Sequence, residues 1–452
     1  MIRLHNPALE QLPPADLRRL QTEKLKQQLT RVYNDSPYYF EKFNKAGVKP
    51  ANFSTLEQLA EYPFFDKDEE RASQETSLRE AGHPLGMHIT CDLKAVRRIS
   101  SSSGTTGTPT FSGFTQKDRD ITVENMARLM ARVGLTEGDT VMHAGVLSMW
   151  VAGLPPLDAL MGAGACVIPM GALSGMERLA QIAAVTHPKA VLCTPSFAIH
   201  LGRQLLERTG IEPRTLGIEK FLVFGEPGGS VKEIYEEIAD SFGGADTFDV
   251  MGATGCHSPV GISCEEHAGI HYFAADNAYF EIVDPATMQP LPLEDGVEGE
   301  IVFTGLDKEC APQIRWRDKD IIRVTTTPCR CGRPGIRMMF KGRVDDMLLV
   351  KGVNVFPNAV RDVINRVSPL TTGNIRIVKD SAGPVVQAPV RIKVEVRDEA
   401  TEAELAALGS QLEQAIHHQL RFRAQPLFIR AADFEVRSGA TGKMHLTEVA
   451  GE

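Results

Sequence analysis

The strongest chemical signal in the sequence is a run of hydroxyl side chains and glycines at residues 100–110, SSSSGTTGTPT. Glycines allow a backbone to approach a ligand closely, and hydroxyls together with backbone N–H groups can surround phosphate oxygens. A flexible polar loop is the alternative explanation. The run is not a Walker loop, because it lacks GxxxxGK[ST]. No convincing GxGxxG opens a helix either, which disfavours a dinucleotide-dependent dehydrogenase.

Cysteines and histidines form a second group of candidates. Cys329 and Cys331 lie in a turn bounded by proline and glycine, and Cys264, His267 and His271 lie upstream. Zinc takes four thiolate and imidazole ligands tetrahedrally, so three cysteines and one histidine would suit a structural zinc ion. Buried free thiols are the alternative. Further candidate ligands are Cys256, His257 and Cys310.

The elements that must position these residues alternate between apolar runs and helical stretches from about residue 87 to 250. This alternation predicts βαβ units around a parallel sheet. The predicted strands are 141–146, 165–168, 190–193 and 220–224. The predicted helices between them are 154–161, 176–185 and 196–208.

The regions before and after this alternation have different sequence patterns. The first 80 residues have helical periodicity, and residues 270–345 contain shorter strands, such as 279–283 and 299–304, which predict a β-rich subdomain. Residues after 345 predict a compact α+β unit. The sequence therefore predicts an α/β protein with a large N-terminal domain, 1–344, and a small C-terminal α+β domain, 345–452.

Composition excludes some classes of function. The 452 residues include 49 basic and 58 acidic side chains, a net charge of −9, so no broad basic face for nucleic acid or an anionic membrane is expected. No apolar run approaches the roughly 20 residues of a membrane span, and the amino terminus lacks the apolar segment of a secretory signal. We expect a cytoplasmic protein whose eight cysteines are thiols or metal ligands.

Five motifs, in order, resemble those of the adenylate-forming superfamily of acyl-CoA synthetases and luciferases. They are SSSGTTGTPT at 101–110, DVMGAT at 249–254, RWRDKD at 315–320, GRVDDM at 342–347 and GK at 442–443. Within that superfamily the short chain resembles the phenylacetate–CoA ligase branch. Further segments that support this branch are DSPYY at 35–39, TPS at 194–196, FGEPG at 224–228 and KGVNVFP at 351–357.

The resemblance implies an AMP-forming ligase for an aryl or arylacetic acid, with ATP, Mg²⁺ and coenzyme A as partners. The acid would attack the α-phosphorus of ATP to give an acyl-adenylate and pyrophosphate, and the CoA thiolate would then displace AMP. Lys443, on a mobile C-terminal domain, would bridge the acyl carboxylate and the α-phosphate, with Asp345 as the hinge. The alternatives are transfer of the acyl group to an amine or a carrier protein, and a degenerate nucleotide-binding protein. A zinc-ribbon module for nucleic acid is disfavoured by the acidic composition.

The resemblance also implies where the nucleotide would bind. Asp320 and Arg343 would bind the ribose hydroxyls. The phosphate loop would comprise Ser102, Ser103, Gly104, Thr105, Thr106, Gly107 and Thr108. The adenine side would comprise Gly225, Glu226, Pro227, Asp249, Met251, Gly252 and Thr254.

The acid pocket and a zinc site are implied in the same way. Trp150 could stack on a flat ring, and His143 is either a core histidine or a group that binds a polar ring substituent. The implied pocket residues are Gly145, Trp150, Ala253 and Pro259. The zinc ligands implied by a subset of the branch are Cys264, His271, Cys329 and Cys331. A homodimer is also expected.

Two positions depart from the superfamily pattern. Thr108 stands where the loop usually has lysine, and Gly255 stands where a glutamate usually serves Mg²⁺. Magnesium held through ATP phosphates and water, or by a nearby acid such as Glu265 or Glu266, is the expected compensation.

Overall fold

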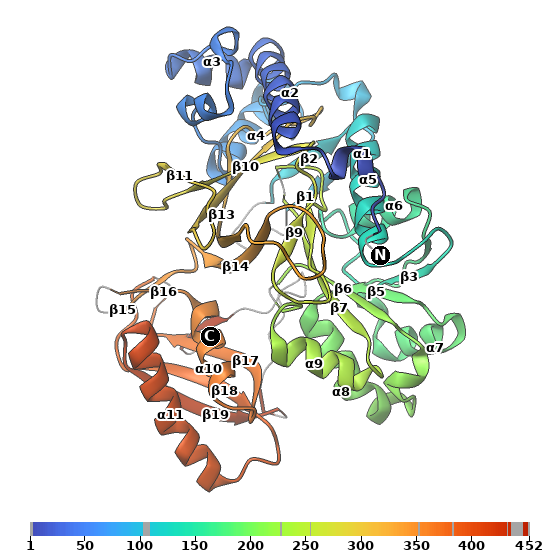
Figure 1. Cartoon of the computed structure of the whole chain (residues 1–452), viewed down its shortest axis with the longest axis vertical. Helices are drawn as coiled ribbons and strands as arrows, with labels where there is room; N and C mark the ends of the chain where they lie inside the picture. Colours follow the sequence, from blue (N-terminus) through green and yellow to red (C-terminus); the bar gives the residue numbers. More distant parts are fainter. Residues whose placement is uncertain are drawn as a thin grey trace.

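The structure, a computed structural model, describes residues 3–102, 109–226, 228–253, 255–350, 353–381, 384–431, 433–434 and 446–450. The first part of the chain is helical, and α2 (Pro14–Asp35), α3 (Pro37–Lys45) and α4 (Lys67–Ala81) lie at the top of Figure 1. Proline opens α2 and α3, where its missing N–H costs nothing, and Asp66 caps α4 in a capping box. Helix α1 (Pro7–Glu10) precedes them. Three single 3₁₀ turns accompany them, at Pro50–Asn52, Leu56–Glu61 and Leu93–Ala95.

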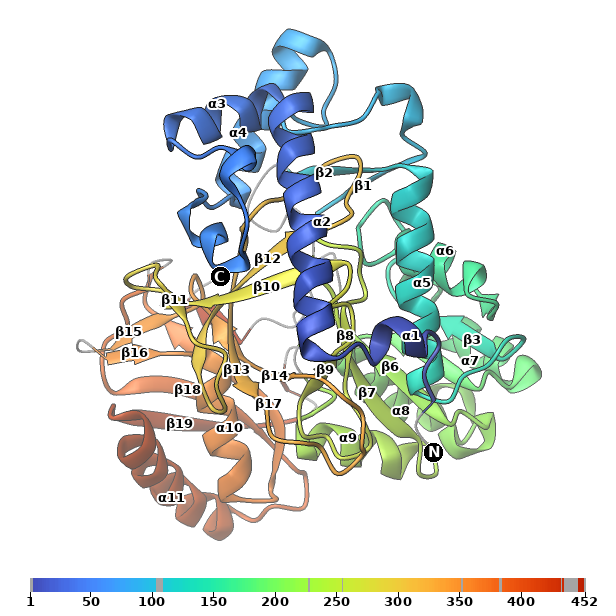
Figure 2. The same cartoon turned by 45° about the horizontal axis from the view of Figure 1, so that its top comes forward.

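Side-chain hydrogen bonds from helix α2 hold this helical region against the rest of the protein. The Lys24 ammonium lies 2.6 Å from Asp307, and the Gln28 amide donates to the carbonyl of Lys308 at 2.7 Å. Both acceptors follow strand β12 (Glu298–Gly305), beside which α2 lies in Figure 2. The aromatic core of the region, which includes Tyr39 and Phe43, is fully buried.

A parallel sheet with helices on both faces occupies the next part of the chain. In β5, Ala190 and Leu192 enter one core cluster while Val191 and Cys193 enter another, as the two-residue repeat of a strand buried on both faces requires. The parallel strands are β3 (Thr140–His143), β4 (Cys166–Ile168), β5 (Ala190–Cys193), β6 (Lys220–Val223) and β7 (Asp246–Met251). The helices are α5 (Gln116–Arg132), α6 (Leu154–Gly162), α7 (Met176–Thr186), α8 (Pro195–Thr209) and α9 (Lys232–Ser241). Two 3₁₀ turns, Ala172–Ser174 and Pro213–Leu216, complete this part.

Antiparallel strands continue the same sheet. Strand β7 pairs with β8, with Val250 opposite Ile262, so the parallel strands and the predicted β-rich subdomain form one mixed sheet of 12 strands. Its order is β11-β10-β12-β13-β14-β9-β8-β7-β6-β5-β3-β4. The added strands are β8 (Gly261–Ile262), β9 (Ile270–Tyr272), β10 (Ala278–Val283), β11 (Pro290–Leu291), β12, β13 (Trp316–Thr325) and β14 (Arg337–Arg343).

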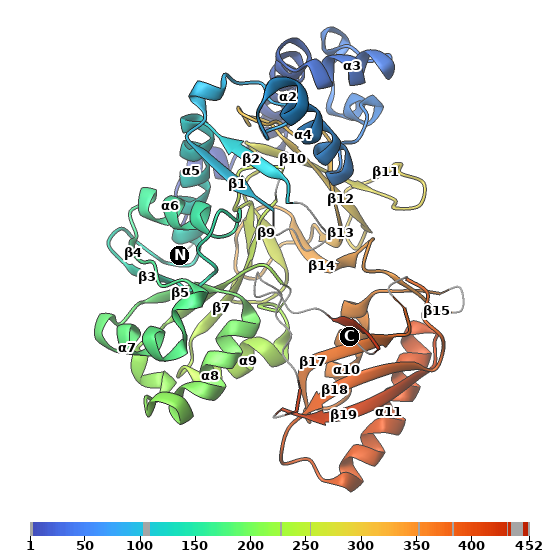
Figure 3. The ribbon, with the colours of Figure 1, turned by 180° about the vertical axis from the view of Figure 1, so that it is seen from behind.

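The C-terminal elements form a separate core around a four-stranded sheet, seen from behind in Figure 3. The sheet order is β19-β18-β17-β20, and α10 and α11 pack with it. The elements are β15 (Leu348–Val350), β16 (Val353–Val355), α10 (Pro357–Val367), β17 (Thr371–Lys379), β18 (Val390–Val396), α11 (Glu402–Leu420), β19 (Ala424–Arg430) and β20 (Thr447–Val449). The predicted boundary at residue 344 lies between β14 and β15.

The predicted mixed α/β fold is confirmed, with local differences. Strand 190–193 matches β5, whereas the strand predicted to reach 146 ends at His143. Beyond the strand, Ala144 N still donates to the Leu192 carbonyl, while Gly171 N and Ala172 N donate to the carbonyls of His143 and Gly145. Among the described residues, no helix is both long and apolar enough to cross a membrane.

Candidate active site

The predicted phosphate loop is the connection between two short antiparallel strands, β1 (Arg98–Ser101) and β2 (Phe111–Phe114). Residues 103–108 lie outside the described residues, so six of the seven predicted loop residues receive no structural account. Ser102 N donates to the Thr110 carbonyl at 2.8 Å, and Thr110 N donates to Ser102 Oγ at 3.0 Å. These two bonds fix the distance between the ends of the loop.

Helix α4 packs against this hairpin. The Gln74 amide donates to the Phe111 carbonyl at 2.7 Å and accepts from Phe111 N at 3.0 Å. Figures 1 and 3 show α4 beside β1 and β2 from opposite sides. The base of the phosphate loop is therefore built against a helix more than 20 residues earlier in the chain.

One turn before Gln74, α4 carries a buried carboxylate that sequence reasoning missed. Glu70 is 2% exposed; its Oε1 accepts from the Gln313 amide at 2.9 Å, and its Oε2 has no hydrogen-bond partner among the described residues. Burial raises the pKa of Glu70 to about 7, although the Thr110 side chain and the Lys67 charge act to lower it. An acid with an open oxygen thus lies beside Thr110.

The predicted adenine residues lie at the carboxyl ends of β6 and β7, the edge at which open parallel sheets bind ligands. Val223 pairs with Asp249, whose carboxylate accepts from Gly229 N at 2.8 Å. Burial raises the pKa of Asp249. Glu226 accepts from Ser196 N at 2.8 Å, at the start of α8. Gly225, Met251 and Gly252 belong to the same strand ends, whereas Pro227 and Thr254 lie outside the described residues.

The predicted ribose pair faces across β13 and β14. Asp320 is opposite Arg343, and the carboxylate and guanidinium lie 2.8 Å apart. Arg343 also makes a two-pronged contact with the predicted hinge residue Asp345, at 2.9 and 3.0 Å. The other arginines of the motif, Arg315 and Arg317, bind Glu281 and Glu300. Among these three arginines, Arg343 is thus the one that contacts both the predicted ribose residue and the predicted hinge residue.

The predicted acid pocket includes an aromatic wall. The rings of Trp150 and Phe224 lie 6.1 Å apart, and a Cβ added to Gly145 would lie 2.8 Å from Phe224 Cζ. Trp150, Phe224 and Ala253 belong to one buried cluster, and Pro259 is buried beside Val260 of that cluster. Sequence reasoning missed Phe224, although it ends the predicted strand 220–224.

His143 lies next to this wall and is fully buried. A Cβ at Gly145 would lie 3.0 Å from its Cε1. Neither ring nitrogen has a hydrogen-bond partner among the described residues, and burial lowers the pKa of His143 to about 4. The ring is therefore neutral at pH 7.

The segment around Trp150, which carries predicted acid-pocket residues, is joined by backbone hydrogen bonds to the hairpin of β1 and β2. Ser101 N donates to the Met149 carbonyl at 2.7 Å, and Val151 N donates to the Ser101 carbonyl at 2.9 Å. Ser101 and Trp150 therefore lie side by side as a parallel bridge. We call these two bonds the Ser101 seam.

Four predicted metal ligands come together where loops carrying the three cysteines meet strand β9, which carries the histidine. The ligand atoms of Cys264, His271, Cys329 and Cys331 all lie within 4.8 Å of one another. Cys264 Sγ is 3.7 Å from Cys329 Sγ, and Cys331 Sγ is 3.4 Å from His271 Nε2. All eight cysteines of the chain are described, and all are free thiols.

The competing ligands have other partners. His267 stacks on Tyr235 at 3.7 Å between ring centroids, and His257 binds Asp118 at 3.0 Å. Cys256 packs in the core. A hydrogen bond with the Cys91 thiol and burial both raise the pKa of the Cys310 thiol.

Lys443 lies outside the described residues, but other charges of the C-terminal elements are described. Arg203 on α8 binds Glu237 on α9 and, at 2.9 Å, Glu395 on β18. Arg361 on α10 is buried, and the charges of Glu226 and Asp249 act on it. The C-terminal elements therefore face the predicted adenine side.

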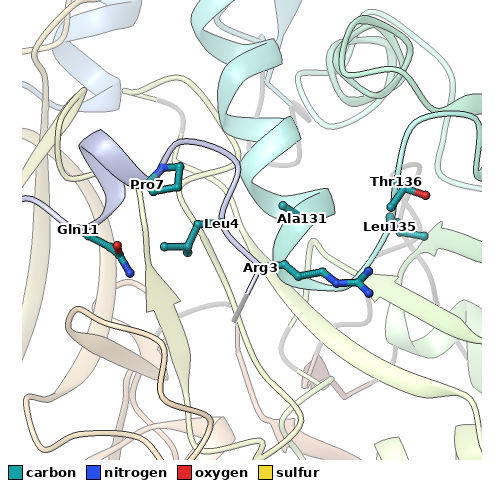
Figure 4. A pocket seen from close by; sticks show the side chains of 7 residues that line it. All are labelled: Arg3, Leu4, Pro7, Gln11, Ala131, Leu135 and Thr136. Atoms are coloured by element: carbon teal, nitrogen blue, oxygen red, sulfur yellow. The ribbon is translucent and has the colours of Figure 1, made fainter. Parts of the chain in front are cut away.

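A surface cavity of about 510 Å³ lies elsewhere, between the amino-terminal segment and the end of α5 (Figure 4). No predicted site residue lines it. The lining residues are Arg3, Leu4, Pro7, Gln11, Ala131, Leu135 and Thr136.

Comparisons with known proteins place this geometry in context. No family model matches the chain. A phenylacetate–coenzyme A ligase of Thermus thermophilus is 33% identical over 395 residues, 86% of this chain and 84% of the relative. Another from Escherichia coli is 30% identical over 415 residues, 91% of this chain and 89% of the relative.

A solved structure extends the comparison to the whole chain. A 2-hydroxyisobutyryl-CoA ligase in the postadenylation state, in complex with 2-HIB-AMP, is 25% identical with a TM-score of 0.86, covering 98% of this chain and 92% of the other. The same ligase in its thioesterification state has a TM-score of 0.70. The arrangement of this chain therefore matches the postadenylation state more closely.

Proposed function

The chain belongs to the phenylacetate–coenzyme A ligase family, and we propose that it activates an aromatic or arylacetic acid. The protein is an AMP-forming acid–CoA ligase. The observation that carries the choice of acid is the wall of Trp150 and Phe224 beside Gly145, because flat rings pack well against aromatic side chains and mostly apolar walls bind apolar acids. His143, neutral and without a described partner, would bind a polar ring substituent.

The reaction proceeds in two half-reactions. The acid carboxylate attacks the α-phosphorus of ATP, and the bond from that phosphorus to pyrophosphate breaks. The CoA thiolate then attacks the acyl carbon, and AMP leaves with the electrons of the acyl–oxygen bond. The first half gathers negative charge, so positioned cations and donors should supply most of the catalysis.

We assign the residues as follows. Lys443 places its ammonium between the acid carboxylate and the α-phosphate. Asp320 accepts from the ribose hydroxyls while Arg343 donates to them. Backbone groups around Gly225 and Met251 border the adenine. Ser102 and the following hydroxyls and glycines to Thr108 surround the phosphates.

We divide the chain at residue 344 and place the hinge at Asp345. The contact of Arg343 with Asp345 supports this position, because rotation at 345 would alter the group that also binds the ribose. The C-terminal domain, 345–452, would carry Lys443 toward the acid in the first half-reaction and away from it in the second.

We also propose a structural zinc ion at Cys264, His271, Cys329 and Cys331. Three thiolates and one imidazole within 4.8 Å suit tetrahedral zinc, and four protein ligands leave no open position for catalysis. Elemental analysis should find about one zinc per chain. The Cys329→Ser variant should lose it, and the control Cys166→Ser, at an exposed thiol, should keep it. Wild-type protein purified without chelator that contains no zinc would contradict the assignment.

A cytoplasmic location and a homodimer remain predictions. The free thiols and the use of ATP and CoA support the first.

Activity against a panel of acids tests the proposed substrate. Aromatic, arylacetic and short aliphatic acids, including 2-hydroxyisobutyrate, would be compared by AMP release with ATP and CoA present. Aromatic acids should give the highest kcat/KM, and Gly145→Ala should reduce kcat/KM for them more than for short acids, because its Cβ would press on Phe224. A preference for the short hydroxy acid would refute the aromatic assignment.

A further inference from the structure

ATP brings a cluster of negative charge that enzymes usually meet with Mg²⁺, which binds the phosphates and one or two protein carboxylates. Position 255, which follows the adenine strand, is glycine and cannot supply such a carboxylate. The structure shows what occupies the space in front of it. A Cβ added to Gly255 would lie 2.9 Å from Gln313 Oε1 and 3.1 Å from Trp316 Cβ.

Gln313 connects this position to Glu70. Its Oε1 fills the space in front of Gly255, and its Nε2 donates to Glu70 Oε1 at 2.9 Å. The side-chain amide of Gln313 therefore lies between the Glu70 carboxylate and the position that a Cβ at residue 255 would occupy. The carboxylate comes from α4, 185 positions earlier in the sequence.

Glu70 is a buried carboxylate with one oxygen that has no hydrogen-bond partner among the described residues. It is 2% exposed and its Oε2 makes no hydrogen bond among the described residues. Leaving a buried carboxylate oxygen unsatisfied costs free energy, so such a group needs an explanation. Its neighbour Thr110 closes the phosphate loop by bonding to Ser102.

Four other acids that the sequence points to near the nucleotide have partners of their own. Asp249 accepts from Gly229 N, and Asp320 binds Arg343. Glu265 and Glu266, the substitutes suggested by sequence, pair with Arg333 and Arg330 beside the cysteine cluster. Their carboxylates therefore have other roles.

We propose that Glu70 contributes a carboxylate ligand to the Mg²⁺ that accompanies ATP, in the place left open by glycine at 255. The assignment rests on the proposed ligase function. Gln313 is a positioning residue that holds one oxygen of Glu70 and leaves the other open toward the metal.

Calorimetric titration of ATP into the full chain, at a series of free Mg²⁺ concentrations, tests the assignment. Glu70→Gln keeps the shape of the side chain and removes its charge. It should raise the Mg²⁺ concentration for half-maximal ATP binding about tenfold or more. The matched control Glu75→Gln, at an exposed position on the same helix, should leave it at the wild-type value.

A second arm moves the carboxylate. In Glu70→Gln with Gln313→Ala, space opens in front of residue 255, and adding Gly255→Glu should bring the Mg²⁺ requirement back toward wild type. If Glu70→Gln binds ATP with an unchanged Mg²⁺ requirement, the assignment is wrong and the ligase function stands. If the wild-type protein binds no ATP at any Mg²⁺ concentration, both are overturned.

Discussion

Two buried carboxylates of this chain differ in how fully they are satisfied. Asp118, on α5, is 0% exposed and accepts hydrogen bonds from His257 at 3.0 Å and from the backbone N–H groups of Glu309 and Cys310 at 2.6 and 3.0 Å. Glu70, on α4, is 2% exposed; its Oε1 accepts from Gln313, and its Oε2 has no hydrogen-bond partner among the described residues.

Their pKa values move in opposite directions. Burial acts to raise the pKa of Asp118, but the hydrogen bond from His257 and the charge of Lys308 outweigh it and hold the pKa below its usual range. Burial of Glu70 outweighs the lowering effects of the Thr110 side chain, the Lys67 charge and the Gln313 amide, so its pKa rises to about 7. A buried acid whose hydrogen bonds are satisfied stabilises the fold, and the unsatisfied oxygen of Glu70 is what motivates the proposed Mg²⁺ ligand.

The largest expected effect is that of Asp118→Asn on stability. Both carboxylate oxygens of Asp118 accept from N–H groups, so either orientation of an asparagine would place its NH₂ against a donor. The free energy of unfolding should therefore fall by about 3–5 kcal/mol. Urea unfolding followed by circular dichroism measures this. A decrease in the free energy of unfolding of less than about 1 kcal/mol would show that Asp118 does not stabilise the fold as the comparison requires.

The same variant gives a pH test. The pKa of Asp118 is lower in the folded state than the value of about 3.9 in the unfolded chain. The stability it contributes is therefore complete above about pH 4 and is lost as the pH falls further. The difference in Tm between wild type and Asp118→Asn should shrink between about pH 4 and pH 2; a constant difference would show that Asp118 does not act as an anion.

Lys443→Ala tests a residue that should act on the substrates and should not contribute to the stability of the fold. Adenylation should slow about 10²- to 10³-fold, the usual cost of one preorganised donor. Thioester formation from preformed acyl-adenylate should slow much less. Equal losses in both half-reactions, measured by pyrophosphate release and by thioester formation, would contradict the role.

Asp320→Asn tests an acid of intermediate kind. Asp320 pairs with Arg343 within the protein and is also expected to accept hydrogen bonds from the ribose. KM for ATP should rise about tenfold, as expected for one hydrogen bond to a charged group. Asp380→Asn is a suitable control, because Asp380 pairs with Arg391 at an exposed position. Equal KM values in the two variants would argue against ribose binding.

The smallest effect is expected for Glu70→Gln without ligand. Removing an incompletely satisfied buried charge should leave the free energy of unfolding within about 1 kcal/mol of wild type, or raise it. Chemical denaturation without ATP or Mg²⁺ measures this. A loss near that of Asp118→Asn would show that Glu70 is structural.

Local sequence patterns predicted the elements that carry the site. Strands such as 190–193 were found because an apolar run buried on both faces is visible within a few residues. The four cysteine and histidine positions could be named because their residue types are chemically specific. The joining of the parallel and antiparallel strands was not predicted, since the pairing of β7 with β8 depends on register rather than on composition.

Glu70 could not be found in this way. Its partner Gln313 is 243 positions away, and on a helix of polar composition one more glutamate suggests a solvated face. Phe224 is a similar case, since an apolar residue that ends a strand suggests core packing. Both residues acquire their meaning from neighbours that only the folded chain supplies.

The Ser101 seam has a practical consequence for altering this enzyme. The segment around Trp150, which is proposed to border the acid, and the strand that leads into the predicted phosphate loop share backbone hydrogen bonds at 2.7 and 2.9 Å. A substitution that shifts the backbone at 149–151 to admit a larger acid will also displace Ser101. If the proposed roles of Trp150 and the loop hold, variants selected for new acids should also show altered ATP affinity.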